Sequence, residues 1–224
     1  MAELINTSLF SDANLQAYYR LDDVNDDKNS NNLTNTGSVA FVGGKYGSCA
    51  DFGATINIKN LSIASNLGYD GGAYSICGWI KFRTLTTDDN VGIFRVTNSD
   101  TDTRLDLHYD YNSGTRQIGF GRSRVGVADD YKQYTVSLGT TNWNHIAHVY
   151  NGSTCYLYVN GVNVDSVAST GSGTSAVGDI FNIGYDNDPA AYLEDVACFD
   201  RELTSAEVKQ LYEDTGGGFL FNFL

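Results

Sequence analysis

Paired carboxylates are the first chemistry to test in this sequence, because acidic residues outnumber basic ones by 27 to 14. Hydrolysis of a glycosidic bond generally needs two carboxylates that flank the bond. Only five of the acids are Glu, and none has the spacing that would place a pair on one face of a strand. Glu194 and Asp195 are adjacent, so in a strand they would point to opposite faces. We therefore assign no catalytic residue and expect that the protein is not an enzyme.

Nucleophilic and zinc chemistry are equally poorly supported. The sequence has no G-x-S-x-G motif. Its three histidines, His108, His145 and His148, are too far apart for a zinc motif. His145 and His148 are three residues apart in a predicted strand, so they would face opposite sides. We expect both to be structural.

The cysteines and the N-terminal residues bear on the compartment. Cys49, Cys77, Cys155 and Cys198 form no C-x-x-C pair, and Cys155 and Cys198 alternate with apolar residues. This pattern favours buried free thiols, although one disulfide stays open. Residues 1–30 contain no recognisable secretory signal. We expect assembly in a reducing compartment and action outside the cell or on a virion surface, while a cytoplasmic location stays open.

Tyrosines in Asp- and Asn-rich segments are the candidates for ligand binding, because aromatic faces pack on the apolar faces of sugar rings. The predicted binding rim consists of Tyr109, Tyr111, Arg124, Tyr131, Tyr134, Asp186 and Asp188. Two alternatives stay open. Exposed tyrosines are common on sheets, and the segment 186–188 could instead hold Ca²⁺ or form a plain turn.

Short β segments must position these residues. Apolar stretches bounded by Asn, Asp and Gly predict strands at 15–21, 48–52, 54–58, 74–82, 91–96, 105–109, 116–120, 146–150, 155–159, 162–167, 180–184 and 192–199. Asn-Gly pairs at 151–152 and 160–161 predict two type I′ turns and a three-stranded meander. A capping box between Thr204 and Glu207 predicts a helix over 203–212.

These elements predict an all-β fold: a two-sheet antiparallel β-sandwich (jelly roll) with one short C-terminal helix. No linker divides the chain, whose only proline lies in a predicted loop. We expect an N-terminal arm at 1–14, one domain at 15–215, and a Gly-rich hydrophobic tail at 216–224.

Several segments match a known pattern in the same order along the chain. They are LQAYYRLDD at 15–23, DKNSNNL at 27–33, GKYGSCADFG at 44–53, YSICGWIK at 74–81, WNHIA at 143–147, LYVNG at 157–161 and YLEDVACFDRELT at 192–204. Together they resemble the concanavalin A-like, laminin G-like (LamG-like) jelly-roll domains of bacteria and phages. That fold hosts lectins, adhesins, virion proteins and hydrolases, so the resemblance implies the jelly roll without selecting one function.

The resemblance also implies a Ca²⁺ site between the early Asp-rich loop and the penultimate strand, formed by Asp27, Asn32 and Glu194. The loop lacks the family's glycines, and Lys28 could occupy the cation position. The alternative is a loop whose Asx side chains cap their own backbone.

The resemblance places Trp79 and Trp143 in the core. Calcium, where bound, could also bridge anionic glycans, which the acidic surface would otherwise disfavour.

Charge and the C-terminal tail bear on partners. A net charge of −13 argues against nucleic acid, and no apolar run is long enough to span a membrane. We predict that the tail docks on a neighbouring subunit in a homo-oligomer or larger assembly, with packing on its own domain as the alternative. The side chains assigned to this contact are Phe219, Leu220, Phe221, Phe223 and Leu224.

The sequence therefore predicts a non-catalytic, lectin-like binding module that recognises carbohydrate or a cell surface, with Ca²⁺ as a candidate cofactor. The alternative is a structural subunit of a virion, fibre or surface assembly that is joined through its terminal segments.

Overall fold

The computed structural model describes residues 3–53, 59–69, 71–83, 89–97, 103–112, 115–122, 130–136, 138, 140–169, 180–186 and 191–214. Within these ranges the side chains of residues 6, 89–91, 103–104, 111–112 and 186 are not described. The elements in chain order are η1 (Leu4–Asn6), η2 (Ser8–Ser11), β1 (Leu15–Tyr19), β2 (Thr34–Thr36), β3 (Ala40–Gly43), β4 (Ser48–Asp51), β5 (Asn60–Ile63), β6 (Tyr74–Phe82), β7 (Asp89–Thr97), β8 (Thr103–Asn112), β9 (Thr115–Arg122), β10 (Asp130–Thr135), β11 (Asn144–Tyr150), β12 (Thr154–Val159), β13 (Val162–Ala168), β14 (Ile180–Asp186), β15 (Ala191–Phe199) and α1 (Ser205–Tyr212).

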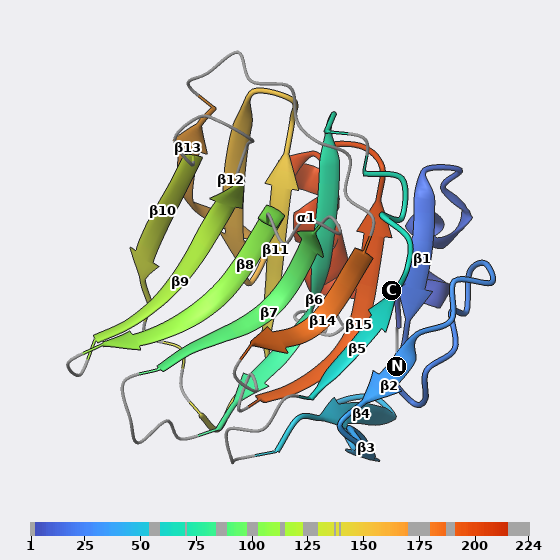
Figure 1. Ribbon diagram of the computed structural model, residues 1–224. Helices are drawn as coiled ribbons and strands as arrows, with labels where there is room; N and C mark the ends of the chain where they lie inside the picture. Colours follow the sequence, from blue (N-terminus) through green and yellow to red (C-terminus); the bar gives the residue numbers. More distant parts are fainter. Residues whose placement is uncertain are drawn as a thin grey trace, which may run out of the picture.

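The strands form two antiparallel sheets that pack face to face (Figure 1). Sheet A has the order β13-β12-β11-β6-β15-β4-β3, and β1 also pairs with β15. Sheet B has the order β10-β9-β8-β7-β14-β5-β2. Consecutive strands pair at one end of each sheet, whereas β6 with β15 and β7 with β14 join distant parts of the chain, as in a jelly roll. The predicted two-sheet sandwich is confirmed.

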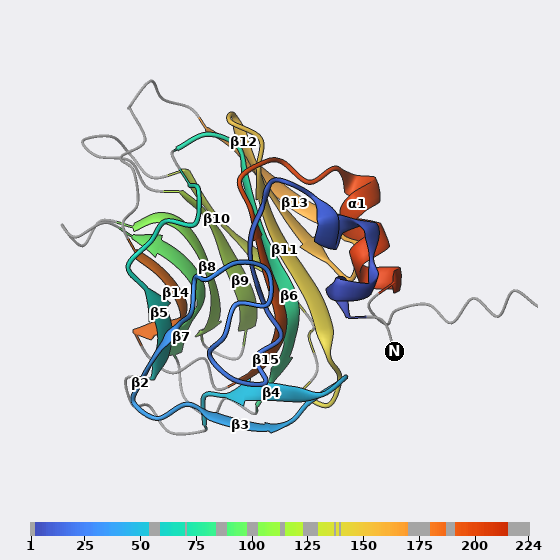
Figure 2. The same ribbon diagram turned by 90° about the vertical axis from the view of Figure 1, so that its right-hand side faces the viewer.

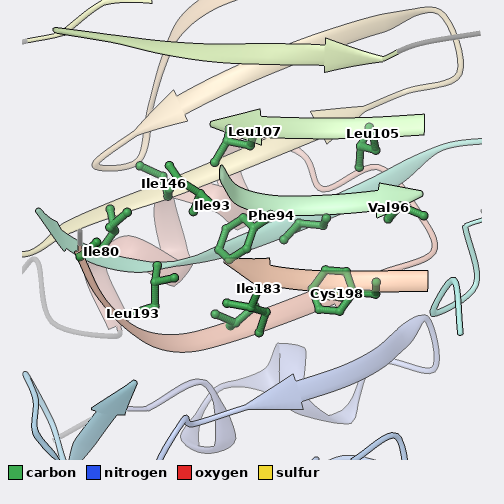
Figure 3. Packing of buried hydrophobic residues seen from close by; sticks show 14 of the residues in the cluster. Ile80, Ile93, Phe94, Val96, Leu105, Leu107, Ile146, Ile183, Leu193 and Cys198 are labelled. Atoms are coloured by element: carbon green, nitrogen blue, oxygen red, sulfur yellow. The ribbon is translucent and has the colours of Figure 1, made fainter. Parts of the chain in front are cut away.

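The core lies between the sheets (Figure 3). Alternation along each strand turns every second side chain inward, so Leu105 and Leu107 of β8 face Ile80 and Ile146 of sheet A. Each of these four side chains is at most 1% exposed. Burial of such side chains stabilises a fold by about 1.5–3 kcal/mol each.

The predicted meander is present as β11-β12-β13, but only one of its two turns has the predicted geometry. Asn160 and Gly161 both have positive φ, at 51° and 77°, as a type I′ turn requires. Between β11 and β12 the loop is longer, and the Asn151 side chain accepts hydrogen bonds from the backbone N–H groups of Ser153 and Thr154. The asparagine there acts as a side-chain cap instead of a left-handed turn residue.

A second apolar cluster covers the outer face of sheet A. Figure 2 shows α1 and the N-terminal 3₁₀ helices on the side of sheet A that faces away from sheet B. Leu4 and Leu9 of the N-terminal segment pack with Val208 and Leu211 of α1 against this face. Residues 3–14, which the sequence predicted as an arm, therefore pack on the domain.

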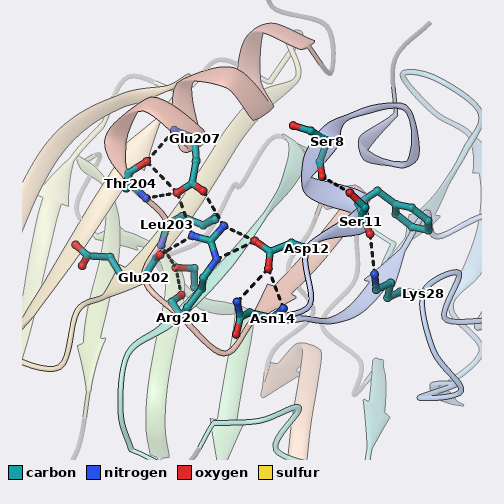
Figure 4. Close-up of polar contacts among 12 residues, drawn as sticks. Ser8, Ser11, Asp12, Asn14, Lys28, Arg201, Glu202, Leu203, Thr204 and Glu207 are labelled. Carbon is teal, nitrogen blue, oxygen red and sulfur yellow. Dashed lines mark hydrogen bonds and ion pairs between the residues drawn. The ribbon is translucent and has the colours of Figure 1, made fainter.

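Arg201 ties the N-terminal segment to α1 (Figure 4). Its guanidinium donates to Asp12 at 2.5 Å and to Glu207 at 2.7 Å. Glu207 also accepts from the backbone N–H of Thr204, whose hydroxyl accepts from the Glu207 N–H, so the predicted capping box is present. The same carboxylate thus begins the helix and anchors the arginine.

Outside these regions the sequence predictions have clear gaps. Strands β2, β3, β5 and β10 were missed, because β2, β3 and β5 are only three or four residues long and β10 is mostly polar. The strand predicted at 54–58 lies outside the described residues.

All four cysteines are buried and free, as predicted. In the described part of the chain, no helix has the length and apolar character to cross a membrane.

Candidate functional site

The outer face of sheet B presents a row of polar and aromatic side chains. Leu105, Leu107 and Tyr109 of β8 point into the core, so the alternate residues Asp106 and His108 point outward. Register in the sheet places His108 opposite Gly92 of β7 and Gly119 of β9. We call Arg95, Asp106, His108, Tyr131 and Tyr185 the sheet B platform.

Two glycines make room for the platform's aromatic rings. A Cβ atom on Gly92 would overlap the ring of Tyr185, its partner across the sheet. A Cβ atom on Gly119 would overlap the phenol oxygen of Tyr131 and crowd His108 Nε2. Tyrosine rings can therefore lie on the sheet only where the strand beneath lacks a side chain.

Asp106 fixes the orientation of the platform. Its Oδ2 lies 2.7 Å from His108 Nδ1, and its Oδ1 accepts a hydrogen bond from the Tyr185 hydroxyl. The Arg95 guanidinium lies 3.6 Å from the centre of the Tyr185 ring, and its Nε is 3.7 Å from Asp106 Oδ1. Since Asp106 binds three neighbours, it holds them in one arrangement.

The exposed part of this arrangement is the ring of Tyr131. Tyr131 is 37% exposed, stacks on His108 with 5.2 Å between ring centres, and bonds His108 Nε2 through its hydroxyl. Burial raises the pKa of Tyr131 above its usual value, so the hydroxyl remains protonated. Beside it, the exposed Gln133 donates to Asp110 at 2.8 Å. The platform thus offers the aromatic ring of Tyr131, together with fixed guanidinium and hydroxyl groups and the neighbouring amide of Gln133.

A second arrangement of buried polar groups surrounds Glu194 on the outer side of sheet A. The Glu194 carboxylate accepts hydrogen bonds from the backbone N–H groups of Lys45, Tyr46 and Gly47, at 2.5, 2.8 and 3.1 Å. Burial nevertheless raises the pKa of Glu194 above its usual value. A Cβ atom on Gly44 would overlap Glu194 Oε2, so the tight turn at 44–47 depends on glycine.

The prediction that Glu194 and Asp195 point to opposite faces of the strand is wrong. The register with β6 shifts between Glu194 and Ala197, and Asp195 has a φ of 59°, which mark a β-bulge. The bulge turns the Asp195 carboxylate to the outer side, where it accepts from the hydroxyl of Tyr18, a member of the cluster under α1. Burial, with the charge of Glu194 beside it, raises the pKa of Asp195 to about 7.

The three residues of the predicted Ca²⁺ site all have other partners. Asp27 pairs with Arg20 at 2.9 Å, and the Asn32 side chain accepts from the Asp26 backbone N–H at 3.0 Å. Glu194 is bound to the turn at 44–47, so the three side chains as placed do not fit a shared ion. Across the described residues, no three His, Cys, Asp or Glu side chains form a group that could hold a metal. Calcium stays a prediction of the resemblance.

The early loop has the alternative arrangement, in which Asx side chains bond the loop's own backbone. Asp26, which was not singled out, is only 7% exposed. Its Oδ1 accepts from the N–H groups of Tyr18 and Lys28, each at 2.9 Å, and its Oδ2 from that of Asn31 at 3.2 Å. The side chain that organises the loop is therefore a buried aspartate.

Of the predicted rim residues, only Tyr109, Tyr131 and Tyr134 have described side chains, and these three do not share one surface. Tyr109 is a core residue at 1% exposure, and Tyr134 packs partly buried against the core, because both lie on inward positions of their strands. Tyr131 alone reaches the platform. Tyr111 and Asp186 lie in β8 and β14 without described side chains. Outside the described residues lie Arg124, Asp188 and the tail residues Phe219, Leu220, Phe221, Phe223 and Leu224.

Sequence reasoning missed most of the platform. The available signal was alternation in β8, where polar residues at 106, 108 and 110 interleave with apolar ones, together with the glycines opposite them. His145 and His148, expected to be structural, are both buried at 3% and 1% exposure. Trp79 is buried as predicted, whereas Trp143 is partly exposed and so is not a full core residue.

Comparison with known protein families shows which family this chain belongs to. The chain belongs to the concanavalin A-like lectin/glucanases superfamily, whose laminin G model matches residues 52–209. No curated protein sequence matches the chain.

Solved structures with this fold include toxin binding domains. The binding domain of botulinum neurotoxin DC in complex with SialylT matches with a TM-score of 0.71 and 11% identity over 90% of this chain and 51% of that one. The binding domain of Paraclostridial mosquitocidal protein 1 matches at 0.69 and 15%, over 90% and 52%. The receptor-binding domain of botulinum neurotoxin type G matches at 0.67 and 14%, over 91% and 52%. The chain spans about half the length of these structures, and at such identities the likeness is one of fold.

Proposed function

We propose that this chain is a non-catalytic carbohydrate-binding module whose sheet B platform contacts the sugar. The observation that carries the proposal is the exposed ring of Tyr131, which is held on the sheet by His108 and made possible by Gly119. An aromatic face binds the apolar face of a sugar ring, while adjacent polar groups bond its hydroxyls. Because the platform is already ordered, little conformational entropy is lost on binding.

The burial of the acidic pair supports a non-catalytic role. Glu194 and Asp195 are 2% and 5% exposed, and both accept hydrogen bonds from the protein itself. Asp106 of the platform is likewise held by its neighbours. A general acid or base must come within hydrogen-bond reach of the reacting group, which these engaged carboxylates do not offer as placed.

The comparisons support the binding role at the level of class. The similar structures are binding domains by name, and one of them was determined with SialylT. The alternative of a virion or fibre subunit rests on tail residues outside the described part of the chain, and these comparisons do not support it.

A glycan array probed with the intact chain, with and without a calcium chelator, tests the proposal. We expect binding to at least one group of related glycans. Loss of that binding with chelator would add calcium to the site, and retention would show that recognition does not need calcium. No binding to any glycan under either condition would refute the proposed function.

Replacing Tyr131 with alanine should weaken binding of the strongest array ligand about tenfold, since a lost aromatic contact is worth on the order of 1–1.5 kcal/mol. Tyr131→Phe keeps the ring and should lose less. Isothermal titration calorimetry gives the affinities. Tyr156→Phe on sheet A is the control, and an unchanged affinity in Tyr131→Ala would show that the ligand binds elsewhere.

Replacing Gly119 with alanine should also weaken binding about tenfold, because the added Cβ atom displaces the end of the Tyr131 ring. The displaced atoms belong to a partly exposed side chain that can rotate outward, so the free energy of unfolding should fall by only about 1 kcal/mol. Urea unfolding and calorimetry on the same sample separate the two effects. An unchanged affinity in Gly119→Ala would contradict the placement of Tyr131 in the site.

A further inference from the structure

The outer face of sheet A carries a second set of exposed rings and charges, beside the part that α1 covers. Register pairs Lys81 of β6 with Tyr192 of β15, and Trp143 lies 6.4 Å from the Tyr192 ring between centres. Trp79, two residues before Lys81 and so on the same face, lies 5.8 Å from Tyr212 of α1, which shows that this is the outer side.

Cations in this region lie over aromatic rings. The Arg83 guanidinium is 4.2 Å and the Lys81 ammonium 5.9 Å from the centre of the Tyr192 ring. The Lys45 ammonium is 4.2 Å from the centre of the Trp79 ring. We call Lys45, Lys81, Arg83, Trp143 and Tyr192 the sheet A patch. All five side chains are partly exposed.

Lys45 and Lys81 differ from Lys132 and Lys209 in their partners. Within the described residues, no carboxylate forms an ion pair with Lys45 or Lys81. Lys132 and Lys209, by contrast, each pair with an acid. In a chain with 27 acids and 14 bases, two unpaired lysines on one face are unexpected. Cation–π contacts hold both lysines in place, while the charges of Glu194 and Asp195 also act on Lys45.

The acidic groups near the patch are already occupied. Asp51 pairs with Arg83 at 2.5 Å, and Glu194 is bound by three backbone N–H groups beneath Lys45. The overall charge of −13 acts through solvent, where exposed charges are screened beyond about 8 Å at physiological ionic strength. Arg83 and Lys45 therefore have acids beside them, whereas Lys81 forms no ion pair with a described carboxylate.

We propose that the sheet A patch binds a saccharide that carries a carboxylate or sulfate group, with Lys45, Lys81 and Arg83 contacting the anion and Trp143 and Tyr192 the sugar ring. The patch is distinct from the sheet B platform, because it lies on the outer face of the other sheet. Charge complementarity selects the anion, and the rings select a sugar over a free ion. The acidic composition therefore does not exclude anionic glycans.

Titration of the intact chain with sialyllactose, lactose sulfate and lactose at low salt tests this proposal. We expect at least one anionic probe to bind about tenfold more tightly than lactose, because the patch lysines contact only the anion. Sialyllactose alone would identify the carboxylate and lactose sulfate alone the sulfate. Added salt should lower the affinity of the unmodified protein for the anionic probe.

Lys81→Gln should weaken binding of the anionic probe about tenfold, since the substitution removes one unpaired positive charge that contacts the anion. Lys209→Gln removes an equal charge from α1 and should change nothing. Tyr131→Ala should also leave this binding intact, which separates the patch from the platform. The proposal is overturned if lactose binds equally well, if neither anionic probe binds at millimolar concentration, or if Lys209→Gln has the same effect as Lys81→Gln.

Discussion

Replacing Gly44 with alanine is expected to lower the free energy of unfolding by about 3 kcal/mol, the range seen when a side chain is forced into an occupied, buried space. The new Cβ atom would overlap Glu194 Oε2 and would lie 2.9 Å from the Cβ atom of Cys49. The Glu194 carboxylate could move only by giving up its three backbone donors, which would leave a buried charge unsatisfied. Chemical denaturation with urea measures the change.

Gly43 supplies the matched control for this prediction. An added Cβ atom there meets nothing within 4 Å, so Gly43→Ala should change the free energy of unfolding by no more than about 0.5 kcal/mol. Equal losses of stability in Gly43→Ala and Gly44→Ala would mean that both glycines are needed for backbone flexibility alone. That result would contradict the role assigned to the turn at 44–47 in binding Glu194.

The second large effect is a pH dependence of stability that depends on Asp195. Burial raises the pKa of Asp195 to about 7 from a usual 3.8, so the folded chain binds this proton more tightly than the unfolded chain does. The stabilisation is fully present below pH 3.8 and is lost as the pH rises to about 7. A shift of this size corresponds to on the order of 4 kcal/mol. In Asp195→Asn this contribution should be absent.

Two buried histidines oppose this effect, so the comparison must be made between variant and unmodified protein. Burial lowers the pKa of His145 to about 3 and that of His148 to about 4. Their stabilising contribution is present above pH 6.5 and is lost as the pH falls toward those values.

The difference in unfolding free energy, Asp195→Asn minus unmodified protein, should therefore rise from pH 4 to pH 7. Asp23→Asn in the exposed early loop is the control for loss of one carboxylate. A flat difference across this range would show that Asp195 is ionised in the fold at low pH.

The two proposed binding surfaces follow from one property of the sandwich. Each sheet has one face in the core and one face outside, and α1 with the N-terminal segment covers only part of the outer face of sheet A. Polar and aromatic residues on the remaining outer positions are free to evolve without loss of the core. The platform and the patch therefore offer different chemistry, one centred on Tyr131 and the other on Lys81.

Local patterns in the sequence were sufficient for much of the fold. Tyr74–Phe82 has the same bounds in the prediction and in the structure, because a long apolar stretch between glycines and a loop leaves no other interpretation. The helix was identified from the Thr204 cap, which acts within one turn of the chain. Strands such as Asp130–Thr135 could not be found this way, because their pairing with β9 and not their own composition makes them strands.

The sequence by itself determined the all-β class, the meander, the capped helix and the four buried thiols, since each depends on residue type and local spacing. Only the tertiary structure decided which tyrosines are exposed on an outer face and which pack in the core. Tyr109 and Tyr131 look alike in sequence, but strand register sends one into the core and sets the other on a glycine. The bulge at Asp195 is also a tertiary outcome, since one extra residue reverses the face on which the acid lies. Contacts between distant segments decide both cases, and no local pattern encodes them.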